Sequence, residues 1–440
     1  MTGPHPQLSR RGFLGASAGA AMAVTLGPAV GTALGSPAAA AEARGRLIPT
    51  GKVGTILYTQ RDAVGRPGVA AGSTLTGFLG RPGMTGPEDL GPEVPLPGGF
   101  LEVFEFLASV GVNQVEFAGL GQNAANPGGT APSLGNVGNP ANLYANREAY
   151  LAYIRTLRGF LDDNGLEAIG NHGYIPASWP GPGSPSTGGA PAGTMNQYER
   201  DRFQLELEAA AILGMPFTGT GSDPTSANNR NKEAWDLAAE KWIALNDLAS
   251  SWGISVYPHN HSPAYNFLQD GPMVTVTEDR LTGAPLATPM EVRGESGIRL
   301  MEYYLQTTDP GLCFIELDIY WAHVAQHQHR WYYDWSGKRQ ELVFDPLAYT
   351  AANTNRIPLY HAKDGDRTAQ APGVGDGYTM VPFQDPRSDI DYQEFLQGQG
   401  AKGYHNPNYE QDNAPGGTAD PGRSLRYSRW SAEQMNALRG

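Results

Sequence analysis

The strongest constraint on the fold is a pattern that recurs along the chain: a helical segment, a turn that often holds glycine, then a short β-rich run. Residues 100–110 have helical apolar spacing, and Gly111 and the run NQVEFAG follow them. A glycine directly after a helix marks its C-terminus. The pattern continues from six further helical segments, at residues 147–163, 198–213, 232–252, 296–307, 345–354 and 391–399.

An opening strand, VGTILYTQ from Val53, brings the strand candidates to eight, and a last helix is expected near SAEQMNAL. Strict alternation of strands and helices indicates an α/β fold with a parallel sheet, and eight units favour a closed (β/α)8 TIM barrel. A doubly wound open sheet is the alternative, but no G-x-G-x-x-G follows a strand to support it. We therefore expect residues 42–440 to form a single barrel domain.

The connections between these elements are unequal in length. Helix-to-strand connections hold two to four residues, whereas many strand-to-helix connections are long and rich in Gly and Pro. The long ones span residues 61–98, 173–194, 262–294, 322–344 and 365–389. In a (β/α)8 barrel these loops all lie on the C-terminal face, where active sites form. Long loops gathered on one face predict a lid or a deep cleft there.

The first 41 residues have the order of a twin-arginine signal peptide and linker. Arg10 and Arg11 stand in SRRGFLG, a Gly- and Ala-rich apolar stretch runs to about Leu34, and SPAAAAEA offers small residues for cleavage. We expect export of a folded protein to the periplasm or the medium, with no stable membrane insertion after the signal is removed. The single cysteine, Cys313, excludes an intrachain disulfide and is expected to pack in the core.

The charge balance of the chain is acidic. It carries 44 acidic and 31 basic side chains, a formal net charge of −13. Loss of the first 40 residues would remove two arginines and no acidic residue. Because nucleic acids and anionic membranes are bound by clustered Lys and Arg, this composition disfavours both partners. A small molecule is the expected partner.

Side chains that bind metals or move protons follow six of the eight strands. They are Glu116, His172, His259, Asn260, His261, Glu316, Asp318, Tyr320, Trp321, His361, Lys363, Asp364, Glu410, Gln411 and Asp412. Because neighbours along a strand point to opposite faces, residues two apart in HNH, IELDIY and HAKD share the inward side. A His or Glu from the fifth strand with Asp318, His361 and Glu410 would suit Mn, Co, Zn or Fe(II) better than Ca.

The phrases PHNHSPAY, FIELDIYWA, LYHAKDGD and YEQDNA, in this order, resemble the xylose isomerase-like TIM barrels, the sugar phosphate isomerases/epimerases. The resemblance implies a divalent metal at the ends of strands five to eight, Mn above all, with Co, Zn, Fe and Mg as alternatives. Asp318, His361 and Glu410 match the last three ligand positions, and His259 aligns best with the first. Many relatives read H-N-H-x-x-E, and Ala264 stands here in place of that glutamate.

The resemblance also implies a reaction in which two glutamates remove and return a proton beside a metal-bound carbonyl. Glu410 fits one of them, and a histidine such as His261, or else Glu116 or Glu316, would replace the other. Lys363 either holds a substrate or enediolate oxygen or forms an ion pair with Asp364, Asp366 or Glu316 at the rim. The side chains expected to contact the substrate are His172, Glu316, Trp321, Asp364 and Gln411.

These residues predict a metal-dependent sugar isomerase or epimerase. A 3-keto-glycoside lyase is the second hypothesis, because β-elimination begins with the same proton abstraction and one base suffices. A non-catalytic, exported sugar-binding barrel is the third, since a fold does not determine an activity. His323, His327 and His329 could form a second metal site, but their spacing matches no ligand motif, so a solvated loop is expected there.

Overall fold

The computed structural model describes residues 45–66, 75–80, 91–121, 131–136, 138–177, 195–226, 228–368, 370–398 and 405–440. The expected signal peptide and its linker, residues 1–41, lie outside these ranges, as do parts of the long loops at 61–98 and 173–194. Within the described ranges, no helix combines the length and the apolar character that crossing a bilayer requires.

Eight short strands form the centre of the domain. They are β1 (Gly54–Ile56), β4 (Gln114–Phe117), β5 (Glu167–Asn171), β6 (Phe217–Gly219), β7 (Ser255–Tyr257), β10 (Glu316–Asp318), β13 (Leu359–Ala362) and β16 (Pro407–Tyr409). Six form one parallel sheet in the order β10-β13-β16-β1-β4-β5, and β6 pairs in parallel with β7. Parallel bridges from His172 to Gly219 and from His259 to Glu316 join the two parts. The ring thus closes in chain order, which confirms the (β/α)8 barrel.

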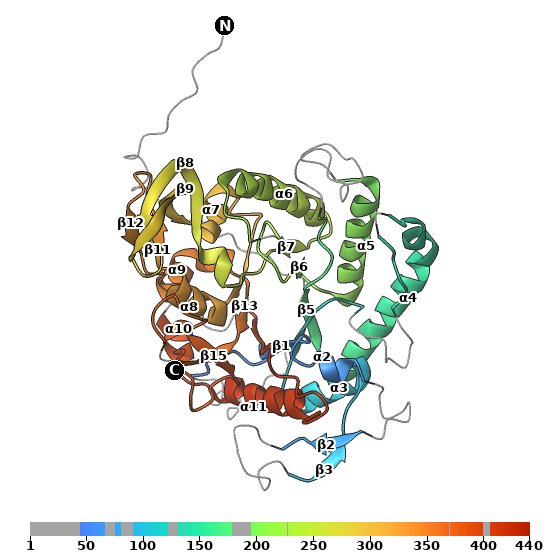
Figure 1. The fold of residues 1–440 in the computed structure, drawn as a ribbon. Coiled ribbons are helices and arrows are strands. Elements are labelled where there is room, and N and C mark those ends of the chain that lie inside the picture. Colours follow the sequence, from blue (N-terminus) through green and yellow to red (C-terminus); the bar gives the residue numbers. More distant parts are fainter. Residues whose placement is uncertain are drawn as a thin grey trace. The chain divides into compact units, whose positions relative to one another are not determined.

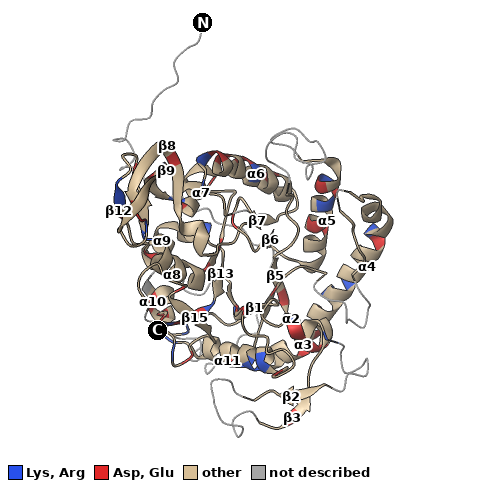
Figure 2. Ribbon diagram, in the orientation of Figure 1, with Lys and Arg blue, Asp and Glu red and all other residues tan. Residues whose placement is uncertain are grey.

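Helices lie around the outside of this ring (Figure 1). They are α3 (Gly99–Ser109), α4 (Ala141–Asn164), α5 (Gln197–Leu213), α6 (Lys232–Ser250), α7 (Leu300–Thr307), α9 (Pro346–Asn353), α10 (Tyr392–Gly398) and α11 (Arg423–Ala437). Gly165 after α4 and Gly214 after α5 have φ angles of 63° and 73°, the left-handed conformation that glycine adopts without strain. Lys and Arg lie alongside Asp and Glu on helices such as α5 and α6 (Figure 2).

Several strand-to-helix connections that we expected only to be long loops contain regular structure. Three are antiparallel hairpins, namely β8 (Phe267–Glu278) with β9 (Pro285–Arg299), β11 (Trp331–Tyr333) with β12 (Arg339–Glu341), and β14 (Asp364–Arg367) with β15 (Tyr378–Val381). Near the N-terminus lie α2 (Arg61–Val64) and the pair β2 (Thr76–Phe78) and β3 (Glu93–Pro95). Glycines serve the turns, as at Gly283 between β8 and β9, where φ is 70°.

The segment after β10 is a helix, α8 (Ile319–Gln328), and not the solvated loop expected for its histidines. Asp318 begins this helix because its carboxylate accepts the backbone N–H of Trp321 at 2.9 Å. The ring of His323 lies 2.7 Å from the Ile319 carbonyl, and that of His327 lies 3.0 Å from the Val374 carbonyl. Both imidazoles therefore serve local packing.

Asn260 links the end of β7 to β10 through two hydrogen bonds. At this point of the ring the two strands are paired by an isolated β-bridge between His259 and Glu316. Its side-chain amide donates to the carbonyl of Asp318 at 3.1 Å, and its amide oxygen accepts the N–H of the same residue at 2.8 Å. The side chain is fully buried. Asn260 therefore points away from its neighbours His259 and His261, as the strand alternation predicts.

Replacing Asn260 by Ala is expected to lower the free energy of unfolding by about 2–4 kcal/mol, because two buried backbone groups of Asp318 lose their partners. Denaturant unfolding followed by circular dichroism measures this loss. Asn353→Ala is the matched control, since that amide makes a local bond to the Tyr349 carbonyl within α9. Equal losses in the two variants would contradict a fastening role for Asn260.

Candidate metal centre and catalytic pocket

A cavity of about 700 Å³ opens at the carboxyl ends of the barrel strands. Its lining includes His172, His259, His261, Trp321 and Glu410. These side chains come from the ends of three strands, β5, β7 and β16, and from the start of α8. The position agrees with the general rule that (β/α)8 barrels carry their chemistry on this face.

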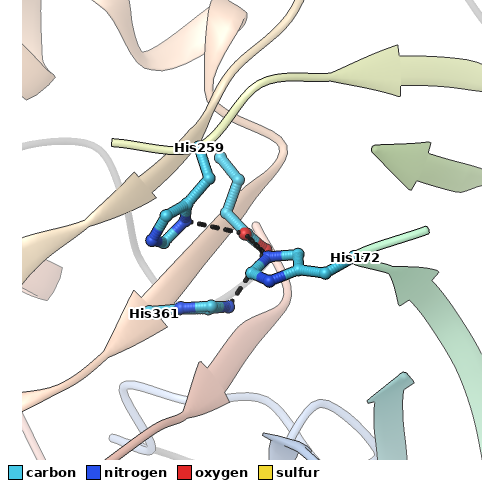
Figure 3. Close-up of side chains that lie close together, drawn as sticks. His172, His259 and His361 are labelled. Carbon is cyan, nitrogen blue, oxygen red and sulfur yellow. Dashed lines mark hydrogen bonds and ion pairs between the residues drawn. The ribbon is translucent and has the colours of Figure 1, made fainter. Parts of the chain in front are cut away.

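Glu316, the first residue of β10, lies at the meeting point of three imidazoles. Its Oε2 is 2.7 Å from Nε2 of His172 and 2.9 Å from Nδ1 of His259, and its Oε1 is 3.3 Å from Nε2 of His361. Figure 3 shows the three histidines directed toward a common point. Because Glu316 is fully buried, the imidazoles take the place of water around its carboxylate.

Lys363 lies among three carboxylates, and one of them, Glu410, also contacts His361. Its Nζ is 2.8 Å from Oδ2 of Asp318, 2.6 Å from Oε2 of Glu410 and 3.1 Å from Oδ1 of Asp412. The ring of Trp321 covers it, with its centroid 5.5 Å from Nζ. Lys363 is fully buried, so it acts as the counter-ion of these acids. Lys363 is thus ion-paired, but not with Asp364, Asp366 or Glu316, the partners expected for such a pair.

Two overlapping sets of side chains could hold a divalent metal, each with ligand atoms within 4.8 Å of one another. They are His259, Asp318, His361 and Glu410, and His172, His259, Glu316 and His361. The first set is the one that the sequence predicts. Imidazole and carboxylate together suit Mn, Fe, Co or Zn. The buried Oε1 of Glu316 makes no hydrogen bond, so the donor atoms present fit a bound metal.

Burial and mutual charge set the protonation of the cluster. Burial lowers the pKa of His361, but the carboxylates of Glu316 and Glu410 outweigh it and raise that pKa well above its usual value. Burial lowers the pKa of His259 well below the usual range. Burial also opposes the charge on Lys363, yet Asp318 and Glu410 hold its pKa well above the ordinary value. Lys363 is therefore an ammonium at neutral pH.

Glu116 on β4 lies beneath the imidazoles and orients them. The hydroxyl of Tyr257 donates to its Oε1, the amide of Asn408 donates to its Oε2 at 2.9 Å, and Nε2 of His361 lies 3.0 Å from the same oxygen. Glu116 is fully buried, so this placement suits orientation of His361 better than contact with a substrate. Sequence reasoning missed Tyr257 and Asn408, which stand two residues before His259 and Glu410 and so share their inward side.

His261 and Trp321 form a wall of the cavity. The His261 ring lies 5.3 Å from the Trp321 ring and 5.2 Å from that of His259, both edge-on. Burial, with the nearby charge of Lys363, lowers the pKa of His261 to about 4. The expected proximity of His261 and Trp321 to the metal ligands is therefore present in the structure.

Two residues expected near the substrate have other partners. Asp364 is buried and accepts the N–H groups of Gly365 and Gln384, each at 2.8 Å, and the hydroxyl of Ser388. Gln411 accepts the Tyr409 hydroxyl at 2.6 Å. Each follows an inward residue by one position, so its side chain turns outward from the barrel centre.

Asp364 gives the protein a pH-dependent stability, because burial raises the pKa of its carboxyl to about 7. Between about pH 4 and pH 7 the folded state holds a proton that the unfolded state has released, so stability falls as pH rises, by about 1.4 kcal/mol per unit. Asp364→Asn is expected to remove up to about 4 kcal/mol of this fall, measured by denaturant unfolding at pH 4 and pH 8. Asp366→Asn on the same strand is the control, and an unchanged pH profile for Asp364→Asn would contradict the assignment.

The closed ring and the strand-end cluster together define a (β/α)8 barrel with its chemistry on the C-terminal face. No family model matches the chain, and no curated protein matches it in sequence. Among solved structures, a sugar phosphate isomerase/epimerase from Parabacteroides distasonis is 16% identical, with 77% of this chain and 88% of that chain covered at a TM-score of 0.44.

Two further solved structures are similar in the course of the chain. A xylose isomerase domain protein from Planctomyces limnophilus is 15% identical, with 73% of this chain and 87% of that chain covered at a TM-score of 0.39. The 3-keto-D-glucoside 4-epimerase YcjR from E. coli is 12% identical, with 77% and 95% covered at a TM-score of 0.41.

Proposed function

We propose that this protein is a metal-dependent isomerase or epimerase that removes a proton next to a carbonyl group of a carbohydrate. The observation that carries the proposal is the buried cluster at one end of the barrel, where potential metal ligands from β7, β10, β13 and the end of β16 lie within 4.8 Å of one another. The cavity that opens onto them, of about 700 Å³, has the size of a small-molecule site.

The cluster offers a metal and a base side by side. A divalent metal held there would polarise the carbonyl and so acidify the neighbouring C–H bond. Glu410 lines the cavity and its carboxylate accepts the proton. Lys363, at 2.6 Å from Glu410, keeps that carboxylate ionised by its positive charge. Glu410 can return the proton to the neighbouring carbon, as an isomerisation requires, and His261, a neutral imidazole because its pKa is lowered to about 4, can act as a second base in the same cavity.

Trp321 supports a carbohydrate as the substrate. Its indole lines the cavity, with its ring 5.3 Å from that of His261. An aromatic face packs against the C–H surface of a sugar ring, so this wall of the cavity suits a carbohydrate.

One observation favours the second candidate, a lyase that acts on 3-keto-glycosides. The segment after the fifth strand, which would supply a second glutamate in the family epimerases, is a short 3₁₀ helix (Ser262–Tyr265) with the buried Ala264 at that position. A β-elimination needs a single base to begin, so Glu410 alone suffices for it. The two candidates share the first proton transfer and differ in its outcome.

Solvent exchange tests the proposal directly. The full chain, loaded with Mn²⁺, is incubated in D₂O with a panel of ketoses and 3-keto-glycosides and followed by NMR. Deuterium uptake with an intact glycosidic linkage supports the isomerase or epimerase, whereas release of an aglycone supports the lyase. Sugar binding without exchange, in the presence of bound metal, would leave only the non-catalytic barrel.

We also propose that the protein is exported through the twin-arginine route. The support is the ordered arrangement of Arg10 and Arg11, the apolar stretch and the small-residue cleavage region. Arg10→Lys combined with Arg11→Lys is expected to retain the precursor in the cytoplasm, as measured by fractionation and immunoblotting. Normal secretion of the double variant would contradict this route.

A further inference from the structure

We propose that a second cavity, whose lining includes His172, Tyr174 and Arg202, is a subsite for an uncharged sugar unit. The preferred substrate is then a glycoside of two sugar units, with the reacting unit in the catalytic cavity and its neighbour in the second one. This inference rests on the proposed function, to which it adds the class of carbohydrate.

The second cavity adjoins the catalytic one on the same face of the barrel. It lies at the ends of β4 and β5, against the helices α4 and α5, which run side by side (Figure 1). Its volume of about 610 Å³ is that of a small-molecule site. His172 lines both cavities, and at the end of β4 Ala118 lines the catalytic cavity and Gly119 the second one. A ligand that extends past His172 therefore occupies both.

Arg202 on α5 lies against two tyrosine rings in the wall of the second cavity. Its guanidinium carbon is 4.9 Å from the ring centroid of Tyr174 and 5.7 Å from that of Tyr150. The side chain of Arg202 is 15% exposed, so its N–H groups can donate to a ligand in the cavity. Aromatic faces pack against the C–H surface of a sugar, and a guanidinium beside them donates to its hydroxyls. This wall therefore suits a sugar ring.

Glu206 holds Arg202 in this position. Its Oε2 lies 3.4 Å from Nη1 of Arg202, and its Oε1 accepts the amide of Asn171 at 2.6 Å and the hydroxyl of Thr218 at 3.4 Å. Asn171 ends β5 and Thr218 lies on β6, and Glu206 itself is buried. The wall is thus tied to the barrel strands, and the guanidinium is oriented before a ligand arrives.

The charges around the second cavity favour an uncharged occupant. Among its described lining residues, Arg202 is the one Lys or Arg, and Glu206 balances its charge. Glu199 adds a further carboxylate, and the imidazole of His172 faces Glu316 at 2.7 Å. A phosphate group is bound where cationic donors are in excess, which is not the case here. A neutral sugar unit fits this lining better than a phosphorylated one.

The experiment compares substrates that share the reacting sugar and differ by one unit. The Mn²⁺-loaded full chain is given D-fructose or its galactoside lactulose, and methyl 3-keto-β-glucoside or 3-keto-cellobiose, and deuterium uptake and aglycone release are followed by NMR. We expect kcat/KM to be about 10-fold higher for the two-unit member of a reactive pair. Tyr174→Ala should remove most of this difference, because the second unit loses its aromatic face.

Tyr144→Ala is the matched control, since Tyr144 is exposed on α4 and donates its hydroxyl to Asp201 at 2.8 Å. It should preserve the difference between the two members of each pair. Circular dichroism verifies the fold of the variants, and Tyr174→Leu replaces Tyr174→Ala if the latter does not fold. An equal loss for both members of a pair in the Tyr174 variant would overturn the subsite, as would a higher kcat/KM for fructose 6-phosphate than for lactulose.

Binding of a pair that does not react separates this inference from the proposed function. Glucose and cellobiose are titrated into the Mn²⁺-loaded full chain in a calorimeter. We expect cellobiose to bind about 10-fold more tightly than glucose to the wild type, and with similar affinity to Tyr174→Ala. That pattern without any proton exchange would sustain the subsite and refute the activity. Equal affinities for the two sugars, with exchange from D-fructose, would sustain the activity and refute the subsite.

Discussion

Glu410→Gln is expected to lower the rate of proton exchange into the substrate by about 10²- to 10⁴-fold, the contribution of a well-placed general base. Glu410 lines the cavity, and its carboxylate lies against both Lys363 and His361. Glutamine keeps the shape and the acceptor oxygen but cannot accept a proton. The measurement is deuterium uptake at saturating substrate, and KM should change little because contacts to the sugar remain.

Asp412→Asn provides the matched control for this experiment. Asp412 also lines the cavity and lies 3.1 Å from Lys363, but Glu410 is the carboxylate in contact with His361. We expect a loss below about 10-fold for Asp412→Asn, short of the range for a general base. A large loss in Asp412→Asn together with near-normal exchange in Glu410→Gln would move the base to Asp412.

The barrel could be predicted because each of its units carries its own local signals. Glycine ends α4 and α5 in the left-handed conformation, and a buried strand begins within a few residues. The hairpins were missed because Gly- and Pro-rich segments were interpreted as loops, although runs such as MVTVTE in β8 have strand propensity. Composition alone does not distinguish a turn within a hairpin from an unstructured loop.

The site was predictable as a set of residues but not as a geometry. Alternation placed Glu316 and Asp318 on the inward side together, yet their partners depend on how neighbouring strands align. The register that sets Asp318 opposite His361 on β13 arises from long-range pairing, which local patterns do not encode. Asp364 and Gln411 were expected near the substrate, although strict alternation from Lys363 and Glu410 already turns them away.

Lys363→Met is expected to lower the free energy of unfolding of the metal-free protein by about 3–5 kcal/mol, because it removes one partner from a buried ion-pair network. Asp318, Glu410 and Asp412 lie 2.6–3.1 Å from the ammonium of Lys363. Methionine matches the length of the lysine stem, so the packing beneath Trp321 is largely kept. Denaturant unfolding in the presence of a chelator measures the loss.

The same variant should respond to metal differently from the wild type. Once the ammonium is gone, the oxygens of Asp318 and Glu410 lack their buried cation, and a divalent ion held by His259, Asp318, His361 and Glu410 can take its place. We expect Mn²⁺ to restore much of the lost stability, as measured by denaturant unfolding with and without the metal. Lys52→Met is the control, since Lys52 pairs with the neutral amide of Asn406. Unchanged stability of metal-free Lys363→Met would show that the three carboxylates do not depend on this lysine.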